Sequence, residues 1–130
     1  MLLNAYLLTL IAYFLFCSPA YAVLSDIEAA VMDKNYDQAR TLAVEVLKTT
    51  AQPEDRAKAE YYLGLSQLRL GQYTEARKAF TIVMHASADA DLYDKAALGL
   101  VEALYVPGFY KDALKEGEAL LRKHPRSPSK

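Results

Sequence analysis

The chain has 130 residues, a formal net charge of −1 and a single cysteine. Its 15 basic and 16 acidic residues are interleaved along the sequence, whereas a nucleic-acid surface needs a clustered basic excess. The composition therefore argues against a polyanion-binding protein, and the length allows one domain with a modest hydrophobic core.

The first 22 residues carry no charge and predict a secretory signal peptide. Leu7 to Phe16 is an apolar run, and Ala20-Tyr21-Ala22 has the small-x-small form that a signal peptidase accepts. We therefore expect an exported chain that starts near Val23 and has lost its only cysteine. The alternative is a retained membrane anchor, because Met1 to Leu24 is nearly long enough to span a bilayer and no basic residue precedes the apolar run.

The segment after the signal predicts a first helical hairpin. Ser25 is expected to cap a short helix that ends before Asn35, since the Glu28 side chain can reach back to the backbone amide of Ser25. A second helix is predicted over Tyr36 to Lys48, where apolar residues recur at helical spacing. Pro53 then suits the first turn of the next helix.

The stretch from Ala59 to Met84 predicts two amphipathic helices that meet at Gly71. Apolar residues recur at helical spacing on both sides of this glycine. Glycine adopts the left-handed conformation that ends a helix at little cost, so the second helix is expected to fold back antiparallel. Gly64 and Ala76 are small enough to let the two helix axes approach, and Phe80 is expected to fill the space around the contact.

A third hairpin is predicted near the end of the chain. Asp91 is expected to cap a helix over Leu92 to Tyr105, which ends at Val106-Pro107-Gly108 because proline disfavours helical geometry in the preceding residue. This turn is expected to be two residues longer than its counterpart in the second hairpin. The last helix is predicted over Phe109 to Lys123, and its Gly117 is expected to let another helix approach.

The three hairpins share a repeated pattern. Tyr-x-x-Ala begins at Tyr36, Tyr73 and Tyr110, which are 37 residues apart each time. Leu63-Gly64 is echoed by Leu98-Gly99, each pair lying in the first predicted helix of its hairpin. The chain therefore resembles the tetratricopeptide repeat family, whose pattern runs Leu-Gly, Tyr, Ala, an aromatic residue and Pro.

The central unit carries most of this resemblance. The positions that match the family pattern are Leu63, Gly64, Tyr73, Ala76 and Phe80. The early tryptophan of the family falls near Glu60, and the helix-breaking proline is missing from this unit. The resemblance implies an all-α fold, an α-solenoid of about three antiparallel helical hairpins after an N-terminal signal helix. The repeats are expected at about 24–52, 53–90 and 91–125 within a domain over 23–126, followed by a tail over 127–130.

No motif in the sequence carries catalytic chemistry. The chain contains no glycine-rich phosphate loop, zinc-ligand spacing or hydrolase nucleophile elbow. Asp89, Asp91 and Asp94 lack the central glycine and closing glutamate of a calcium loop and are interpreted as helix-capping residues. His85 and His124 follow predicted helix ends, where a cation favours the helix dipole. We therefore expect a protein that is not an enzyme and that holds no metal and no cofactor.

The family resemblance implies that the first helix of each hairpin lines a concave groove for a peptide or a partner helix. By alignment with the family, the groove positions are Lys58, Tyr61, Leu65, Leu68, Arg69, Tyr93, Ala96, Leu100 and Leu104. Apolar anchors mixed with two cations favour an apolar or amphipathic ligand that bears acidic residues. For Leu65 and Leu100, packing between repeats is the alternative interpretation.

The ending from Leu121 to Pro128 resembles the repeat ends of bacterial envelope tetratricopeptide proteins. That resemblance implies an exported, periplasmic and noncatalytic scaffold for protein–protein interactions. The alternative is a structural subunit or homo-oligomerisation module of an envelope complex, tethered to the inner membrane if the N-terminal segment is retained. Repeat arrays usually finish with a helix whose outer face is polar. Leu114 or Leu121 is therefore expected to be partly exposed, and the C-terminal edge is expected to be completed by a partner or a second copy.

Overall fold

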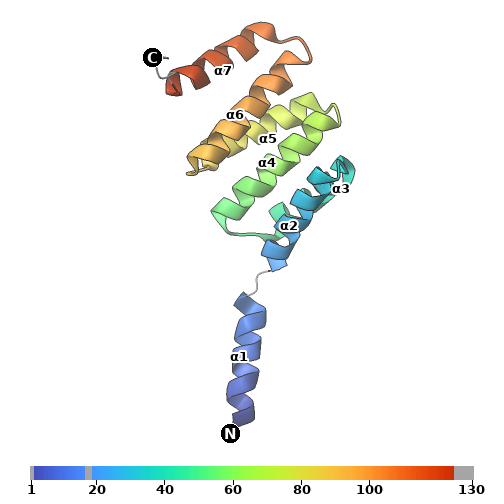
Figure 1. The fold of residues 1–130 in the computed structure, drawn as a ribbon, viewed down its shortest axis with the longest axis vertical. Helices are drawn as coiled ribbons and strands as arrows, with labels where there is room; N and C mark the ends of the chain where they lie inside the picture. Colours follow the sequence, from blue (N-terminus) through green and yellow to red (C-terminus); the bar gives the residue numbers. More distant parts are fainter. Residues whose placement is uncertain (1, 17–18, 125–130) are drawn as a thin grey trace, which may run out of the picture.

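The computed structural model of the chain describes residues 2–16 and 19–124. Within these ranges it contains seven α-helices and no strand, as Figure 1 shows, so the prediction of an all-helical fold is confirmed. The helices are α1 (Leu2–Phe16), α2 (Pro19–Met32), α3 (Tyr36–Thr49), α4 (Pro53–Arg69), α5 (Tyr73–Ala86), α6 (Ala90–Tyr105) and α7 (Tyr110–Lys123). The predicted tail over 127–130 and Cys17 lie outside the described residues.

Helix α1 stands apart from the other six. It carries no charged residue, and within the described ranges it packs against none of the other helices (Figure 1). Among the helices described, none combines the length and the apolar character needed to cross a membrane. Export and cleavage of this segment stay predictions.

The beginning of α2 differs from the expectation. Ser25 does not cap this helix, because α2 begins at Pro19 and Ser25 lies inside it. Proline is favourable in the first turn of a helix, and the residues between Pro19 and Ser25 contain no further proline or glycine that would break it. The predicted cleavage site at Ala20-Tyr21-Ala22 therefore falls within the first turn of α2.

The helices from α2 to α7 form three hairpins that pack in sequence order (Figure 1). Each helix packs against the next one along the chain. In addition, α2 packs against α4, and α4 packs against α6. By contrast, the backbones of α3 and α5 do not come close within the described residues, and neither do those of α5 and α7. The first helices of the hairpins thus form one continuous face, while the second helices are separated from one another.

The three hairpin turns share one hydrogen-bonding pattern. Lys34, Gly71 and Gly108 have positive φ angles of 58°, 79° and 102°. After each of them, the next residue donates its backbone N–H to the carbonyl five residues earlier, over 2.8, 2.8 and 2.9 Å. This is the Schellman arrangement that ends a helix with one left-handed residue. The third turn is longer than the second by one residue and not by the predicted two, because residues 106–109 join α6 to α7 and residues 70–72 join α4 to α5; the other extra residue after Gly99 lies within α6.

The core of the second and third hairpins is built around Phe80 of α5, which is fully buried. A Cβ added to Gly64 of α4 would lie 2.9 Å from the Phe80 ring, and one added to Gly99 of α6 would lie 2.5 Å from it. The two glycines therefore allow α4 and α6 to approach α5 from either side. The prediction that Gly64 allows close packing is confirmed.

Gly117 does not have the predicted role within the described chain. A Cβ added there would have no atom within 4 Å. The side of α7 that contains Gly117 faces open space instead of another helix.

Candidate binding surfaces

The residues predicted to line the groove are divided between the core and the surface. Four of them are buried hydrophobic core residues: Leu68, Ala96, Leu100 and Leu104. Tyr61 and Leu65 are half-buried and pack against the same core. Lys58 is exposed and lines a small pocket between the start of α4 and the loop before α6. Leu68 and Ala96 contribute to packing and offer a partner little or no surface, whereas Leu100 and Leu104 are 9% and 7% exposed and also line a cavity.

Three of the predicted groove residues of α6 lie toward α5 or α7. Leu100 and Leu104 lie on the side of α6 that faces α5 and α7, where they line a cavity. The Tyr93 ring is covered by Lys123 of α7, whose Nζ lies 3.7 Å from the ring centre. Leu100 is 9% exposed, in agreement with the alternative of packing between repeats, and its remaining surface lines this cavity.

The face where α4 and α6 meet carries a small polar network. Arg69 donates to Glu102 across the two helices over 2.8 Å. Burial raises the pKa of the nearby Tyr61 hydroxyl, and the cations Lys95 and Arg69 partly oppose this effect. The side chain of the predicted groove residue Arg69 is therefore already paired across the two helices.

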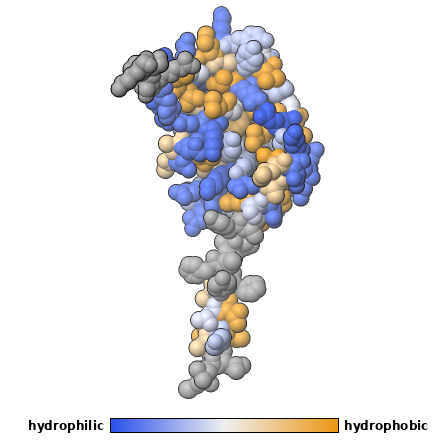
Figure 2. All heavy atoms as spheres, in the orientation of Figure 1, coloured by the Kyte–Doolittle hydropathy of each residue, from blue (hydrophilic) through white to orange (hydrophobic). Residues whose placement is uncertain are grey.

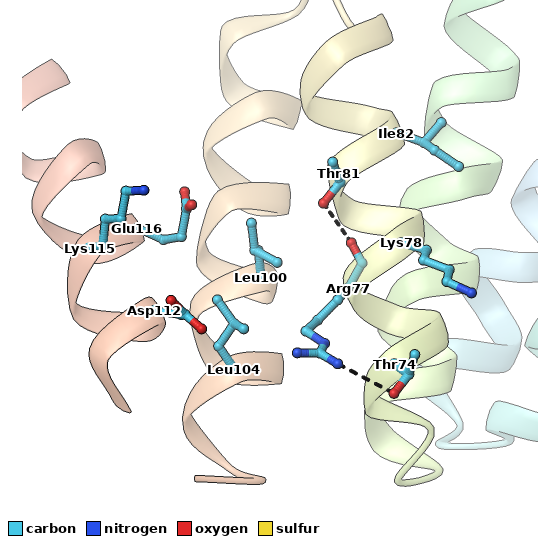
Figure 3. A pocket seen from close by; sticks show the side chains of 10 residues that line it. All are labelled: Thr74, Arg77, Lys78, Thr81, Ile82, Leu100, Leu104, Asp112, Lys115 and Glu116. Carbon is cyan, nitrogen blue, oxygen red and sulfur yellow. Dashed lines mark hydrogen bonds between the residues drawn. The ribbon is translucent and has the colours of Figure 1, made fainter. Parts of the chain in front are cut away.

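A cleft lies between α5 and α7, which do not contact each other in the described chain (Figure 3). It is on a different side of α6 from the face that meets α4. Its volume is about 710 Å³. Leu100 and Leu104 form its floor, and Ile82 of α5 adds a half-exposed apolar side chain. The cleft exists because α5 and α7 both pack against α6 without approaching each other.

The two walls of this cleft carry different charges (Figure 3). The α5 wall presents Arg77 and Lys78, whereas the α7 wall presents Asp112, Lys115 and Glu116. Among the described residues, none of these five side chains forms an ion pair. Their charges are therefore available to a ligand.

Arg77 is held in place by two contacts. Its Nη2 donates to Thr74 Oγ1 over 3.4 Å, and its guanidinium carbon lies 4.8 Å from the centre of the Phe109 ring. A cation over an aromatic face is attracted by the ring quadrupole, so the guanidinium is oriented at the mouth of the cleft. Sequence reasoning missed this residue because it placed the groove on the first helices only. The sequence did contain one sign of a binding surface on α5, because Ile82 is an apolar residue outside the buried stripe of this helix.

The acidic residues near α6 cap the helix and bind the end of α7. The prediction that Asp91 caps α6 is wrong, because Asp89 Oδ1 accepts from the backbone N–H groups of Asp91 and Leu92. Asp94 instead contacts His124 Nε2 over 2.7 Å and Lys123 Nζ over 3.3 Å. Within the described residues, no group of three potential ligands is arranged to hold a metal ion.

Comparisons with known proteins give no further guide to the site. No protein-family model, no curated protein and no solved structure matches this chain. The likeness to tetratricopeptide repeats therefore stays a prediction from the sequence pattern.

Proposed function

We propose that this protein is an exported, noncatalytic scaffold of the bacterial envelope that binds a helical or peptide segment of a partner protein. In this proposal the hairpins from α2 to α7 form a tetratricopeptide-like α-solenoid, and the N-terminal segment acts as a signal peptide. The sequence pattern supports these two statements, and the packed helical hairpins are compatible with them.

The α5–α7 cleft is the observation that carries the proposal. It combines an apolar floor at Leu100 and Leu104 with polar and charged side chains from α5 and α7. An amphipathic helix buries its apolar stripe in such a groove and keeps its polar flanks at the rim. The chemistry of the walls is therefore that of a surface that binds a protein segment.

The charges of the cleft indicate the kind of segment that it accepts. Arg77 points from α5 toward α6, and Lys78 adds a second cation on the other side of α5 (Figure 3), so acidic residues on one flank of the ligand are expected to face α5. On the other flank, a basic residue can pair with Asp112 or Glu116. The ligand that fits best is an amphipathic helix whose acidic flank lies against α5.

Crosslinking in cells tests the proposal directly. A photoreactive residue replaces Lys78 in the full chain, and the control replaces Thr41, an exposed residue at the corresponding place on α3. We expect a discrete protein adduct from position 78 and none from position 41. Arg77→Glu is expected to remove that adduct. Equal adducts from both positions, or an adduct that Arg77→Glu leaves unchanged, would exclude the cleft as the binding site.

Export is tested separately, because it does not depend on the cleft. The protein is recovered from the periplasmic fraction and its N-terminus is sequenced. A start near Val23 is the expected result. Recovery of the intact chain from the membrane fraction would favour the tethered alternative.

A further inference from the structure

Helix α7 carries an apolar stripe that no other described helix covers. Tyr110, Leu114, Gly117 and Leu121 recur at intervals of four, three and four residues, which places them on one side of the helix. Tyr110, Leu114 and Leu121 are 62%, 63% and 62% exposed, so the predicted exposure at Leu114 and Leu121 is confirmed. This spacing is that of a helix packed against another helix along a continuous seam.

Helix α6 extends the same apolar surface. Leu98, Val101 and Tyr105 lie beside the α7 stripe, and the two helices together line a cavity of about 510 Å³. Among the described residues that line this cavity, Glu118 is the one with a charged side chain. Figure 2 shows apolar residues at the surface of the end of the molecule that α6 and α7 form. This surface is distinct from the α5–α7 cleft, which lies on the other side of α7.

The charges beside the stripe are self-complementary. Lys111 and Glu118 follow Tyr110 and Gly117 by one residue each, so both lie on the same flank of the stripe, and Glu118 also lines the cavity that α6 and α7 share. Neither forms an ion pair within the described chain. When two copies of α7 pair antiparallel, Lys111 of each copy faces Glu118 of the other, and two ion pairs form.

The shape of the stripe is also self-complementary. In the same antiparallel register, Leu114 of each copy lies opposite Gly117 of the other, and Tyr110 lies opposite Leu121. The space over Gly117 is open, because an added Cβ would have no atom within 4 Å. Leu114 can therefore enter it as a knob enters a hole. A glycine that weakens α7 by about 1 kcal/mol relative to alanine thereby acquires a packing role.

We propose that two copies of this chain form a twofold-symmetric dimer through an antiparallel pair of α7 helices, with the exposed apolar side chains of α6 covered at the flanks. The dimer buries the α7 stripe and leaves the α5–α7 cleft open, because Asp112 and Glu116 lie on the other side of α7. The dimer does not depend on the ligand proposed for the cleft, so either proposal can fail while the other holds.

Charge exchange between two chains tests this register. Lys111→Glu and Glu118→Lys are each made in the full chain, and sedimentation is measured in detergent that is matched in density to the solvent. In either variant alone both intermolecular pairs become repulsive, so we expect the dissociation constant to rise roughly tenfold. A mixture of the two variants restores both pairs and is expected to form a heterodimer of wild-type affinity. No recovery in the mixture would overturn the antiparallel register.

Two further variants test the apolar seam. Leu114→Glu is expected to give a monomer, whereas the control Met32→Glu, at an 82% exposed position on α2, is expected to leave the dimer unchanged. Gly117→Ala fills the hole and is expected to weaken the dimer while raising the helix stability of the monomer. Circular dichroism reports whether each variant is folded. A wild-type chain that is monomeric at tens of micromolar would disprove the proposal. A dimer that persists in Leu114→Glu would also disprove it and would indicate that another surface, such as α1, forms the interface.

Discussion

The ring of Phe80 fills the space beside Gly99 in which any other residue would place its side chain. A Cβ at Gly99 would lie 2.5 Å from Cζ of the ring, which is closer than real Cβ contacts allow. Phe80 is fully buried and belongs to α5, while Gly99 belongs to α6. The distance between α5 and α6 is therefore set by the Phe80 ring, which fits against α6 because Gly99 has no side chain.

Gly99→Ala is expected to destabilise the fold. The new methyl group forces the Phe80 ring or the α6 backbone to move, and overpacking of this kind costs about 1–3 kcal/mol. That cost outweighs the gain of about 1 kcal/mol from replacing a helical glycine. Urea unfolding measures the difference. The matched control is Gly117→Ala, whose methyl group meets no atom. It is measured at a protein concentration at which the chain is monomeric, and its free energy of unfolding is expected to rise. Equal effects of the two variants would refute the packing argument.

Lys34→Gly is expected to stabilise the protein. Lys34 has a φ of 58° in the first hairpin turn, where Gly71 and Gly108 serve the other two turns. A side chain in the left-handed conformation costs about 1–2 kcal/mol, part of which glycine recovers. Gly71→Ala makes the reverse change at the equivalent place in the second turn and is expected to lower stability. Thermal unfolding of both variants should shift the melting temperature in opposite directions, and shifts of the same sign would count against this account.

The attachment of α7 to α6 is expected to weaken in acid. The hydrogen bond from His124, supported by Lys123, lowers the pKa of Asp94 below its ordinary value of 3.8. Because the folded-state pKa lies below the unfolded value, the stabilisation is fully present above pH 3.8 and is lost as the pH falls below it. Asp94→Asn removes the ion pairs at every pH. We expect its free energy of unfolding to be lower than wild type at pH 6 and to approach wild type at pH 2.5; a constant difference would rule out this role.

The contact between α2 and α4 is expected to weaken in alkali. The Tyr62 hydroxyl donates to Glu28 Oε1 over 2.9 Å, and burial together with this hydrogen bond raises the pKa of Tyr62 above its ordinary value of 10.0. The protonated hydroxyl is therefore favoured in the folded state, and its stabilisation is lost as the pH rises above 10. Tyr62→Phe is expected to cost about 0.5–1.5 kcal/mol at neutral pH. It should also reduce the alkaline loss of stability, which urea unfolding at pH 8 and above pH 10 will measure.

The local features of the fold could be predicted because nearby residues specify them. Gly71 ends a helix because glycine can adopt a positive φ, and Pro53 begins one because its ring fixes φ near the helical value. The 37-residue interval also recurs in the structure, since Lys34, Gly71 and Gly108 hold equivalent positions in the three turns. Capping was less predictable, because Asp89 and Asp91 are both chemically suitable and only the helix start distinguishes them.

The candidate site depended on contacts that no local pattern contains. Leu100 has the spacing of a groove residue, yet it lies in the floor of the α5–α7 cleft because α6 is packed between α5 and α7. Arg77 was not singled out, because its place depends on Phe109, which is 32 residues away in the sequence.

The sequence by itself thus determined most of the helical elements, the glycines of two turns and the apolar periodicity of α7, since hydrophobic periodicity and backbone preferences act over a few residues. Only the tertiary structure decided which helices contact each other, and therefore which apolar side chains are covered. Leu100 and Leu114 both belong to apolar patterns of helical spacing, yet Leu100 lies in the floor of a cleft and Leu114 is exposed. The difference between them is the presence or absence of a neighbouring helix, which is a property of the packed chain and not of either residue.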